Sequence, residues 1–231
     1  MFKFKQFTID DTRCEMKVGT DSVLLGSWVD VAGVRKILDA GCGSGLLAIM
    51  AAQRTTDAKI DAIEFDSNAC SDALNNVADS AFSNRITVIC SDIVTYDFAS
   101  AKYDMIISNP PFFTESLRSP SSGRAASRHE GEFGVEWLLK HASRLLDSEG
   151  SLAFIAPASR DEEIAFKIEL SRLHIQRHCE VIPVAGRPSK RTLWQVSPTQ
   201  GGTPAFSSLT IRNSDGSSTD EYISLTSEFY L

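Results

Sequence analysis

Short apolar runs that alternate with amphipathic stretches constrain the fold of this chain more than any other feature. Residues 35–39 predict a buried strand, and residues 46–54 directly after them predict a helix. The same alternation continues along most of the chain. Strands that are separated by helices form βαβ units, in which the strands pair in parallel. The sequence therefore predicts an α/β fold built around a mostly parallel sheet.

The remaining elements follow from the same patterns. Strands are predicted at 59–64, 85–90, 103–108 and 151–156, and helices at 67–80, 135–146 and 161–173. Three late strands, at 177–184, 192–197 and 207–211, have no helices between them, so an antiparallel finish is expected. Residues 213–220 predict a polar loop before a closing helix or strand. Residues 117–130 hold Ser, Pro, Gly and three arginines and predict a mobile loop.

A glycine-rich loop follows the first predicted strand. Asp39, Gly41, Gly43 and Gly45 occur in the order Asp-Ala-Gly-Cys-Gly-Ser-Gly. Glycines allow a sharp turn and direct contact between backbone and ligand, and open α/β sheets bind ligands at the carboxyl ends of their strands. The spacing differs from the dinucleotide pattern Gly-x-Gly-x-x-Gly. A carboxylate before the loop would repel a pyrophosphate, but it suits a cation such as the amino group of a methionine moiety.

Two further carboxylates follow the next two predicted strands. Glu64 ends the strand 59–64, where it can accept hydrogen bonds from both hydroxyls of a ribose. Asp92 follows the strand 85–90, where it can accept the amino group of an adenine. Together with the loop, these residues indicate a site for a nucleoside without phosphates. The alternatives are a tight turn with a surface Glu64 and a simple turn or helix cap at Asp92.

The tetrapeptide Asn109-Pro110-Pro111-Phe112 follows the fourth predicted strand. Its prolines fix the backbone and are expected to direct two acceptors, the Asn109 side-chain oxygen and the Pro110 carbonyl oxygen, into one cleft. Two acceptors that hold the hydrogens of an aromatic amine free its lone pair to attack a methyl sulfonium. This is catalysis by positioning and preorganised dipoles, and Phe112 would stack on an extruded base. The alternative is a rigid turn without a catalytic role.

These motifs resemble those of a known family. The glycine loop resembles motif I of the class I methyltransferases, which use S-adenosylmethionine, and residues 109–112 resemble motif IV of the amino-group methyltransferases. Residues 4–9 (FKQFTI), residues 14–28 (CEMKVGTDSVLLGSW) and the final EFYL are similar to the bacterial tRNA1(Val) (adenine(37)-N6)-methyltransferase family. The resemblance covers nearly the whole chain and is strongest in its first half.

The resemblance implies a fold and a reaction. Residues 1–231 would form a single class I methyltransferase domain with a Rossmann-like, seven-stranded sheet, helices on both faces and the last strand antiparallel. Residues 1–34 would cover the cofactor site, and residues 35–231 would form the catalytic sheet core. The enzyme would transfer a methyl group from S-adenosylmethionine to N6 of adenine 37 in the anticodon loop of a valine tRNA, leaving S-adenosylhomocysteine. A base in that loop is partly unpaired, so its extrusion should cost little.

The resemblance also implies roles for individual residues. Asn109, Pro110 and Phe112 would hold the target base. The residues expected to bind the cofactor are Lys17, Thr20, Asp39, Gly41, Gly43, Gly45, Glu64, Phe65, Asp92 and Asn109. Relatives often carry Tyr where Phe112 stands, and Phe also occurs there in ribosomal-RNA guanine-N2 methyltransferases, which gives one alternative activity. A protein glutamine-amide methyltransferase, which usually has an extra N-terminal helical domain, and a catalytically silent cofactor-binding module are others.

An RNA substrate must be reconciled with a net charge of −7. Phosphate affinity comes mainly from Lys and Arg, and a local cluster matters more than the total charge. Arg187, Lys190 and Arg191 form the densest basic cluster, and together with Arg128 they are expected to form a phosphate-binding rim. Lys3, Lys5, Arg118 and Arg124 could extend it. A solvated loop without RNA contacts is the alternative.

The cysteines and histidines predict neither a disulfide framework nor a metal site. The five cysteines are odd in number, scattered, and without a Cys-x-x-Cys pair, which favours reduced thiols. His174 and His178 are four residues apart but lack an evident third ligand. The N-terminus has no signal-peptide core, and the longest apolar run, 46–52, is too short to cross a bilayer. We expect a cytoplasmic protein without membrane attachment or an obligate protein partner.

Overall fold

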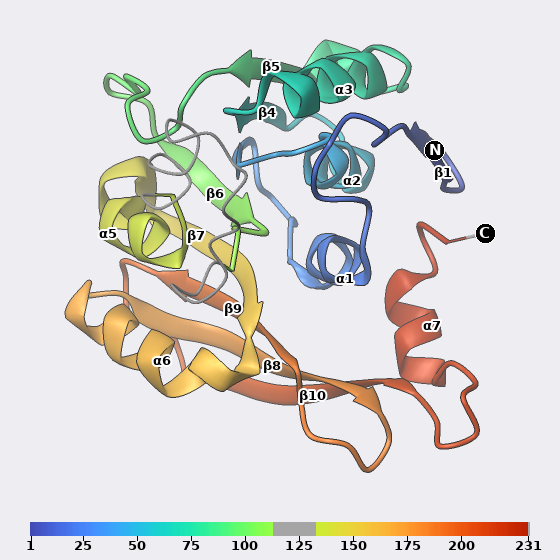
Figure 1. Ribbon diagram of the computed structural model, residues 1–231. Coiled ribbons are helices and arrows are strands. Elements are labelled where there is room, and N and C mark those ends of the chain that lie inside the picture. The colour runs from blue at the N-terminus through green and yellow to red at the C-terminus, as the bar shows by residue number, and fades with distance from the viewer. Residues whose placement is uncertain (113–132, 231) are drawn as a thin grey trace, which may run out of the picture.

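The structure is a computed structural model that describes residues 1–112 and 133–230 (Figure 1). Its centre is an eight-stranded sheet with the order β10-β8-β9-β7-β6-β3-β4-β5. Its strands are β3 (Lys36–Ala40), β4 (Lys59–Glu64), β5 (Ile86–Cys90), β6 (Tyr103–Ser108), β7 (Leu146–Pro157), β8 (His174–Val184), β9 (Arg191–Ser197) and β10 (Ala205–Arg212). The predicted mostly parallel α/β sheet is confirmed.

The far edge of the sheet differs from the prediction. β9 lies between β7 and β8 and is antiparallel to both, whereas β10 pairs in parallel with β8. Among the described residues the sheet therefore has eight strands and not seven, and its antiparallel strand is the next to last. The reason is that the turn after β8 reverses the chain and feeds β9 back beside β7. The connection after β9 then carries the chain past β8, so that β10 starts at the same end as β8.

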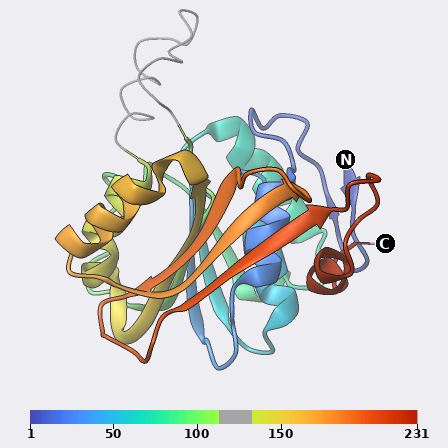
Figure 2. The same ribbon diagram turned by 90° about the horizontal axis from the view of Figure 1, so that it is seen from below.

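Helices cover both faces of the sheet, as predicted. One face packs against α1 (Thr20–Trp28), α2 (Leu46–Arg54), α3 (Ser67–Ala78) and α7 (Asp220–Thr226). The other packs against α5 (Val135–Leu145) and α6 (Asp161–Leu170). Neighbouring strand residues supply the two cores alternately: Ile37 belongs to the first and Leu38 to the second. Figure 2 shows the two helical layers on opposite sides of the sheet. Short 3-10 turns, η1 (Ser83–Arg85) and η3 (Ala158–Arg160), precede β5 and α6.

The N-terminal segment packs beside the glycine loop. It contains the short hairpin of β1 (Phe2–Lys3) and β2 (Thr8–Ile9) before α1. Asn76 of α3 donates from Nδ2 to the carbonyl oxygen of Asp10 (2.8 Å) and to that of Ser44 (2.9 Å), so one side chain joins the segment to the loop. Within the described ranges, no helix is long and apolar enough to cross a membrane.

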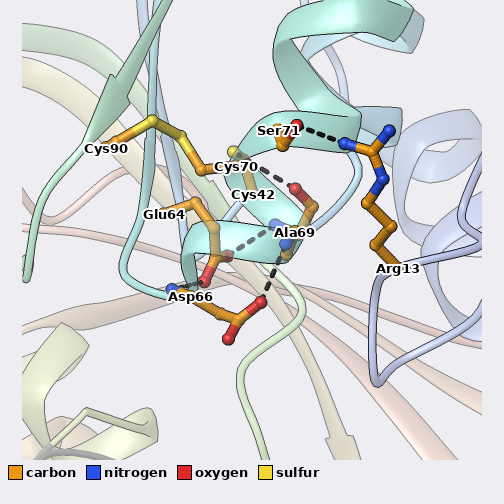
Figure 3. Close-up of a disulfide and its surroundings, with 9 residues drawn as sticks. Arg13, Cys42, Glu64, Asp66, Ala69, Cys70, Ser71 and Cys90 are labelled. Carbon is orange, nitrogen blue, oxygen red and sulfur yellow. Dashed lines mark hydrogen bonds between the residues drawn. A yellow bond between two sulfur atoms is a disulfide. The ribbon is translucent and has the colours of Figure 1, made fainter.

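A disulfide joins Cys70 and Cys90 (Figure 3). The expectation that all the thiols are reduced is therefore wrong for these two, whereas Cys14, Cys42 and Cys179 are free and buried. Cys70 lies in the first turns of α3 and Cys90 ends β5, and packing brings their Cα atoms to 5.7 Å, a distance that a disulfide can span. Twenty residues separate them in the sequence, so no local spacing indicates the pair.

Candidate active site

The carboxyl ends of four adjacent strands bring the predicted site residues together. β3 lies between β4 and β6, and β5 flanks β4. The glycine loop follows β3, Glu64 ends β4, Asp92 follows β5, and Asn109 follows β6. Because all four strands are parallel, these residues emerge at one edge of the sheet (Figure 1).

The glycine loop needs its glycines for conformation and for space. Gly41, Gly43 and Gly45 have φ angles of 71°, 53° and 81°, in the left-handed region that favours glycine. A Cβ atom on Gly41 would lie 2.6 Å from the ring of Phe133, so a side chain there would also collide. The backbone N–H of Gly41 donates to the carbonyl oxygen of Ile63 (3.0 Å), which ties the loop to the end of β4. The loop is thus a tight, backbone-lined turn at the start of α2.

Asp39 is a buried carboxylate with spare acceptor capacity. Its side chain has no solvent exposure. Oδ2 accepts from the backbone N–H of Ala48 (2.9 Å), whereas Oδ1 is buried and has no hydrogen-bond partner among the described residues. Burial, only partly offset by the Ala48 hydrogen bond, raises the pKa of Asp39 to about 8. Such a group is suited to a donor that carries positive charge, because that donor would both satisfy Oδ1 and stabilise the ionised form.

Glu64 is fixed at the end of β4 by two backbone donors. Oε2 accepts from the N–H of Gly43 and Oε1 from the N–H of Asp66, both at 2.8 Å. A carboxylate has about four lone-pair sites, so acceptor capacity remains for a ligand hydroxyl. Burial raises the pKa of Glu64, and the backbone hydrogen bonds oppose that rise. Phe65, next in the chain, exposes 48% of its surface.

Asp92 lies beside Glu64 because β4 and β5 pair, with Glu64 opposite Cys90. Its Oδ1 accepts from the N–H of Val94 (2.9 Å), which holds the carboxylate at the strand end. The disulfide of Cys90 anchors this strand end to α3, the helix that follows Glu64 (Figure 3). The carboxylates predicted to bind one ligand are therefore held on two strand ends that are both joined to α3, β4 by the chain itself and β5 by the disulfide.

Asn109 has one half of its amide engaged and the other half available. Nδ2 donates to the hydroxyl oxygen of Ser22 in α1 (2.9 Å), whereas Oδ1 is buried and has no partner among the described residues. The preceding Ser108 donates to the carbonyl oxygen of Ala40 (2.7 Å), so the end of β6 is fastened to the end of β3. Asn109 therefore presents an unused acceptor one strand away from the glycine loop. Pro110 directly after it is buried.

A second contact links the tetrapeptide to β9. The guanidinium of Arg191 lies over the ring of half-buried Phe112, 5.2 Å from its centroid. Arg191 also donates from Nε to Oδ2 of Asp21 in α1 (2.7 Å). β9 is antiparallel, so its first residue lies at the edge where the parallel strands end. Arg187 and Lys190 are exposed in the turn just before it. Arg128, Arg118 and Arg124 lie outside the described residues.

Lys17 lies just before α1 and Thr20 is its first residue, in the segment whose Ser22 contacts Asn109. The ammonium of Lys17 donates to the carbonyl oxygens of Asp11 (2.7 Å) and Thr12 (3.0 Å), so it braces the backbone of its own segment. Thr20 is exposed at the start of α1. Sequence reasoning did not find Ser22 or Phe133, since only tertiary packing brings them to the site.

The described residues hold no group of three His, Cys, Asp or Glu side chains that could bind a metal ion. His174 and His178 lie in β8, a strand and not a helix. His178 approaches Asp161 (Nε2 to Oδ2, 3.5 Å) and contacts the ring of Trp194. The chemistry available at the site is therefore that of two unused buried acceptors, on Asp39 and Asn109, beside a backbone loop and an aromatic ring.

The chain is similar to known methyltransferases. The family model of the methyltransferase small domain matches residues 12–178. A tRNA1(Val) (adenine(37)-N6)-methyltransferase from Aeromonas hydrophila is 43% identical over 234 residues, which cover 100% of this chain and 97% of that protein. One of the same name from Tolumonas auensis is 42% identical over 231 residues, covering 100% of this chain and 96% of that protein.

Solved structures agree on the fold. A predicted O-methyltransferase from Agrobacterium tumefaciens superposes with a TM-score of 0.69 at 21% identity, over 90% of this chain and 96% of that chain. A ribosomal protein L11 methylase from Lactobacillus delbrueckii subsp. bulgaricus superposes with a TM-score of 0.55 at 15% identity, over 78% of each chain. At these identities the likeness concerns the architecture of the sheet and its helices.

Proposed function

The chain belongs to the methyltransferase small domain family and to its tRNA1(Val) (adenine(37)-N6)-methyltransferases, and on that premise we propose that it methylates N6 of adenine 37 in the anticodon loop of tRNA1(Val), with S-adenosylmethionine as methyl donor. The observation that carries the chemistry is the buried Oδ1 of Asn109, an acceptor without a partner in the described part of the chain, at the end of β6.

The glycine loop and the three carboxylates are suited to hold S-adenosylmethionine. Asp39 offers its unused Oδ1 to the ammonium of the methionine end, and Glu64 offers lone pairs to the ribose hydroxyls. Asp92 and Phe65 would bind the adenine, by a hydrogen bond and by ring contact. Bound there, S-adenosylmethionine supplies an electrophilic methyl group on its sulfonium sulfur. We assign Lys17 and Thr20 to the N-terminal segment, residues 1–34, that would cover this site.

The target amine is activated by position. Oδ1 of Asn109 and the carbonyl oxygen of Pro110 would each accept one hydrogen of N6, which favours a tetrahedral nitrogen with a free lone pair. Phe112 would stack on the extruded base and fix its plane. The proton can leave the nitrogen for solvent after transfer, so the site requires no strong base.

The exposed basic turn before β9 is suited to contact the tRNA backbone. Arg187 and Lys190 are exposed at the same edge of the sheet as Asn109. Phosphate contacts orient an RNA without reading its sequence, so this turn would set where the anticodon loop enters. We propose that Arg191, and Arg128 outside the described residues, also contact the tRNA backbone.

The proposal is tested by incubating the protein with labelled S-adenosylmethionine and total tRNA from a strain that lacks the gene. Digestion and nucleoside analysis should then show label in N6-methyladenosine, and sequencing should place it at position 37 of tRNA1(Val). Label in N2-methylguanosine, or label in protein only, would overturn the proposal. Purified tRNA1(Val) with a guanine at position 37 is the matched control and should accept no label.

A further inference from the structure

We propose that the first turn of α1 is a positioning element for the target base. Ser22 sets the orientation of the Asn109 amide, and Asp21 sets the plane of Phe112 through Arg191. This inference rests on the proposed function and extends it to residues that hold the base-binding groups without touching the base. Both contacts join parts of the chain that are far apart in sequence, 87 residues for Ser22 and Asn109 and 170 for Asp21 and Arg191.

The hydrogen bond to Ser22 holds the Asn109 amide in the orientation that turns its acceptor end to the substrate. An amide has an acceptor end and a donor end, and rotation by half a turn exchanges them. With Nδ2 donating to the Ser22 hydroxyl oxygen at 2.9 Å, Oδ1 is the end left for a ligand. The flipped amide would direct two N–H donors at an amine whose own hydrogens must be accepted. In the observed arrangement Ser22 therefore holds the rotamer that can bind N6.

The Asp21 contact fixes the other side of the base site. Asp21 accepts from Nε of Arg191 at 2.7 Å, which leaves the guanidinium over the Phe112 ring. A cation over one face of an aromatic ring is attracted to it and limits its rotation. Phe112 follows two prolines, is half-buried and packs against both hydrophobic cores, and Arg191 adds a contact over one face of its ring. Arg191 acts here as a support for the stacking residue as well as a basic residue.

The helix that carries both residues is itself firmly placed. Its residues 23–28 are all buried, and α1 packs on α2 and α7. At Gly26 the helices are so close that a Cβ atom would lie 2.7 Å from the side chain of Met50. Arg54 of α2 donates to the carbonyl oxygens of Gly26 (2.9 Å) and Val29 (2.6 Å) at the helix end. A rigid α1 can therefore hold Asn109 and Arg191 in place.

The test for Ser22 compares Ser22→Ala with Ser27→Ala. Ser27 lies in the same helix, is buried, and has a hydroxyl with no partner among the described residues, so its loss is a matched control. At saturating substrates, Ser22→Ala should slow single-turnover methyl transfer about tenfold, the size of one oriented hydrogen bond, and keep the Kd for S-adenosylmethionine. Ser22→Thr should restore the rate, and Ser27→Ala should leave it unchanged.

A double-mutant cycle separates positioning from general damage. If Ser22 acts through Asn109, then Ser22→Ala should have no further effect on the rate in an Asn109→Ala background. In the same way, Asp21→Asn should raise KM for tRNA several-fold, and this effect should vanish in a Phe112→Ala background. Additive effects in either cycle, or a wild-type rate in Ser22→Ala, would overturn the inference. Absence of tRNA methylation by the wild-type protein would instead overturn the proposed function, so the two failures are distinguishable.

Discussion

Replacement of Asp39 by Asn should remove a pH-dependent loss of stability from the free protein and weaken cofactor binding. The carboxyl of Asp39 has no exposure, keeps one oxygen without a partner within the described ranges, and has a pKa raised by burial to about 8. In the unfolded chain its pKa would return to the ordinary value of an aspartate, about 3.9. The folded state therefore retains a proton that the unfolded state releases, and Asp39→Asn removes this difference.

The sign and size follow from proton linkage. Stability falls with rising pH wherever the folded state binds more protons than the unfolded state. For Asp39 that range runs from about pH 4 to about pH 8, because the stability it preserves at low pH is lost as the pH rises through the folded pKa. Between pH 6 and pH 8 the wild type should lose about 2 kcal/mol relative to Asp39→Asn. The amide introduced by Asp39→Asn also brings an N–H donor to the place where Oδ1 has no partner. The free-energy cost of burying this donor does not vary with pH.

Urea unfolding of both proteins at pH 6 and pH 8 measures this double difference, because pH effects from all other groups cancel. Calorimetry then tests the cofactor side. S-adenosylmethionine should release close to one proton from the wild type near pH 7 and bind more tightly as the pH rises. Asp39→Asn should bind more weakly and release fewer protons, since only the cofactor's own amino group still titrates. Parallel stability profiles for the two proteins would refute the assignment of a protonated, buried Asp39.

Three other changes probe separate parts of the site. Asn109→Ala should lower the methyl-transfer rate by about two to three orders of magnitude and leave the Kd for S-adenosylmethionine unchanged, measured by single turnover and calorimetry; a near-normal rate would contradict the mechanism. Cys90→Ser should lower the free energy of unfolding by about 3 kcal/mol in oxidising buffer, given the 20-residue separation of the disulfide, and by nothing in reductant; an equal loss in both buffers would mean that the thiol and not the cross-link matters. The pair Arg187→Glu and Lys190→Glu should weaken tRNA binding about tenfold in filter binding and flatten its salt dependence. Lys59→Glu, at the opposite edge of the sheet, should change neither the tRNA affinity nor its salt dependence. If it weakened tRNA binding as much as the pair does, the basic turn would have no specific role in binding.

The sequence predicts the central elements well because each one carries its own signal. The apolar runs of β4 and β6 match the predicted 59–64 and 103–108 at both ends. α1 was not predicted, since it is buried on nearly all sides and shows no amphipathic period. The entry of β9 between β7 and β8 depends on which long-range pairing is favoured, and an alternation pattern contains no information about strand order.

The candidate site likewise contains residues that the sequence predicts and contacts that it does not. The placement of Asp39, Glu64 and Asn109 at neighbouring strand ends could be predicted, because each follows or ends an apolar run and each position implies a neighbour along the sheet. Their partners could not. The contact of Asn109 with Ser22 and the disulfide of Cys70 with Cys90 depend on how helices pack against those strand ends. Residue type at a strand end indicates the chemistry, and helix packing determines how firmly the group is held.

The direction of β9 explains how an acidic chain could present basic residues to an RNA. β9 spans seven residues and starts at Arg191, beside Pro157 at the end of β7. If β9 ran parallel to β7, Arg191 and the turn before it would lie about 20 Å away, at the opposite edge of the sheet. The antiparallel direction places Arg191 over Phe112 and brings Arg187 and Lys190 to the same edge. Salt screens charges that are more than a screening length away from a phosphate. A tRNA backbone at this edge therefore responds more to the nearby charges than to the net charge of −7 of the whole chain.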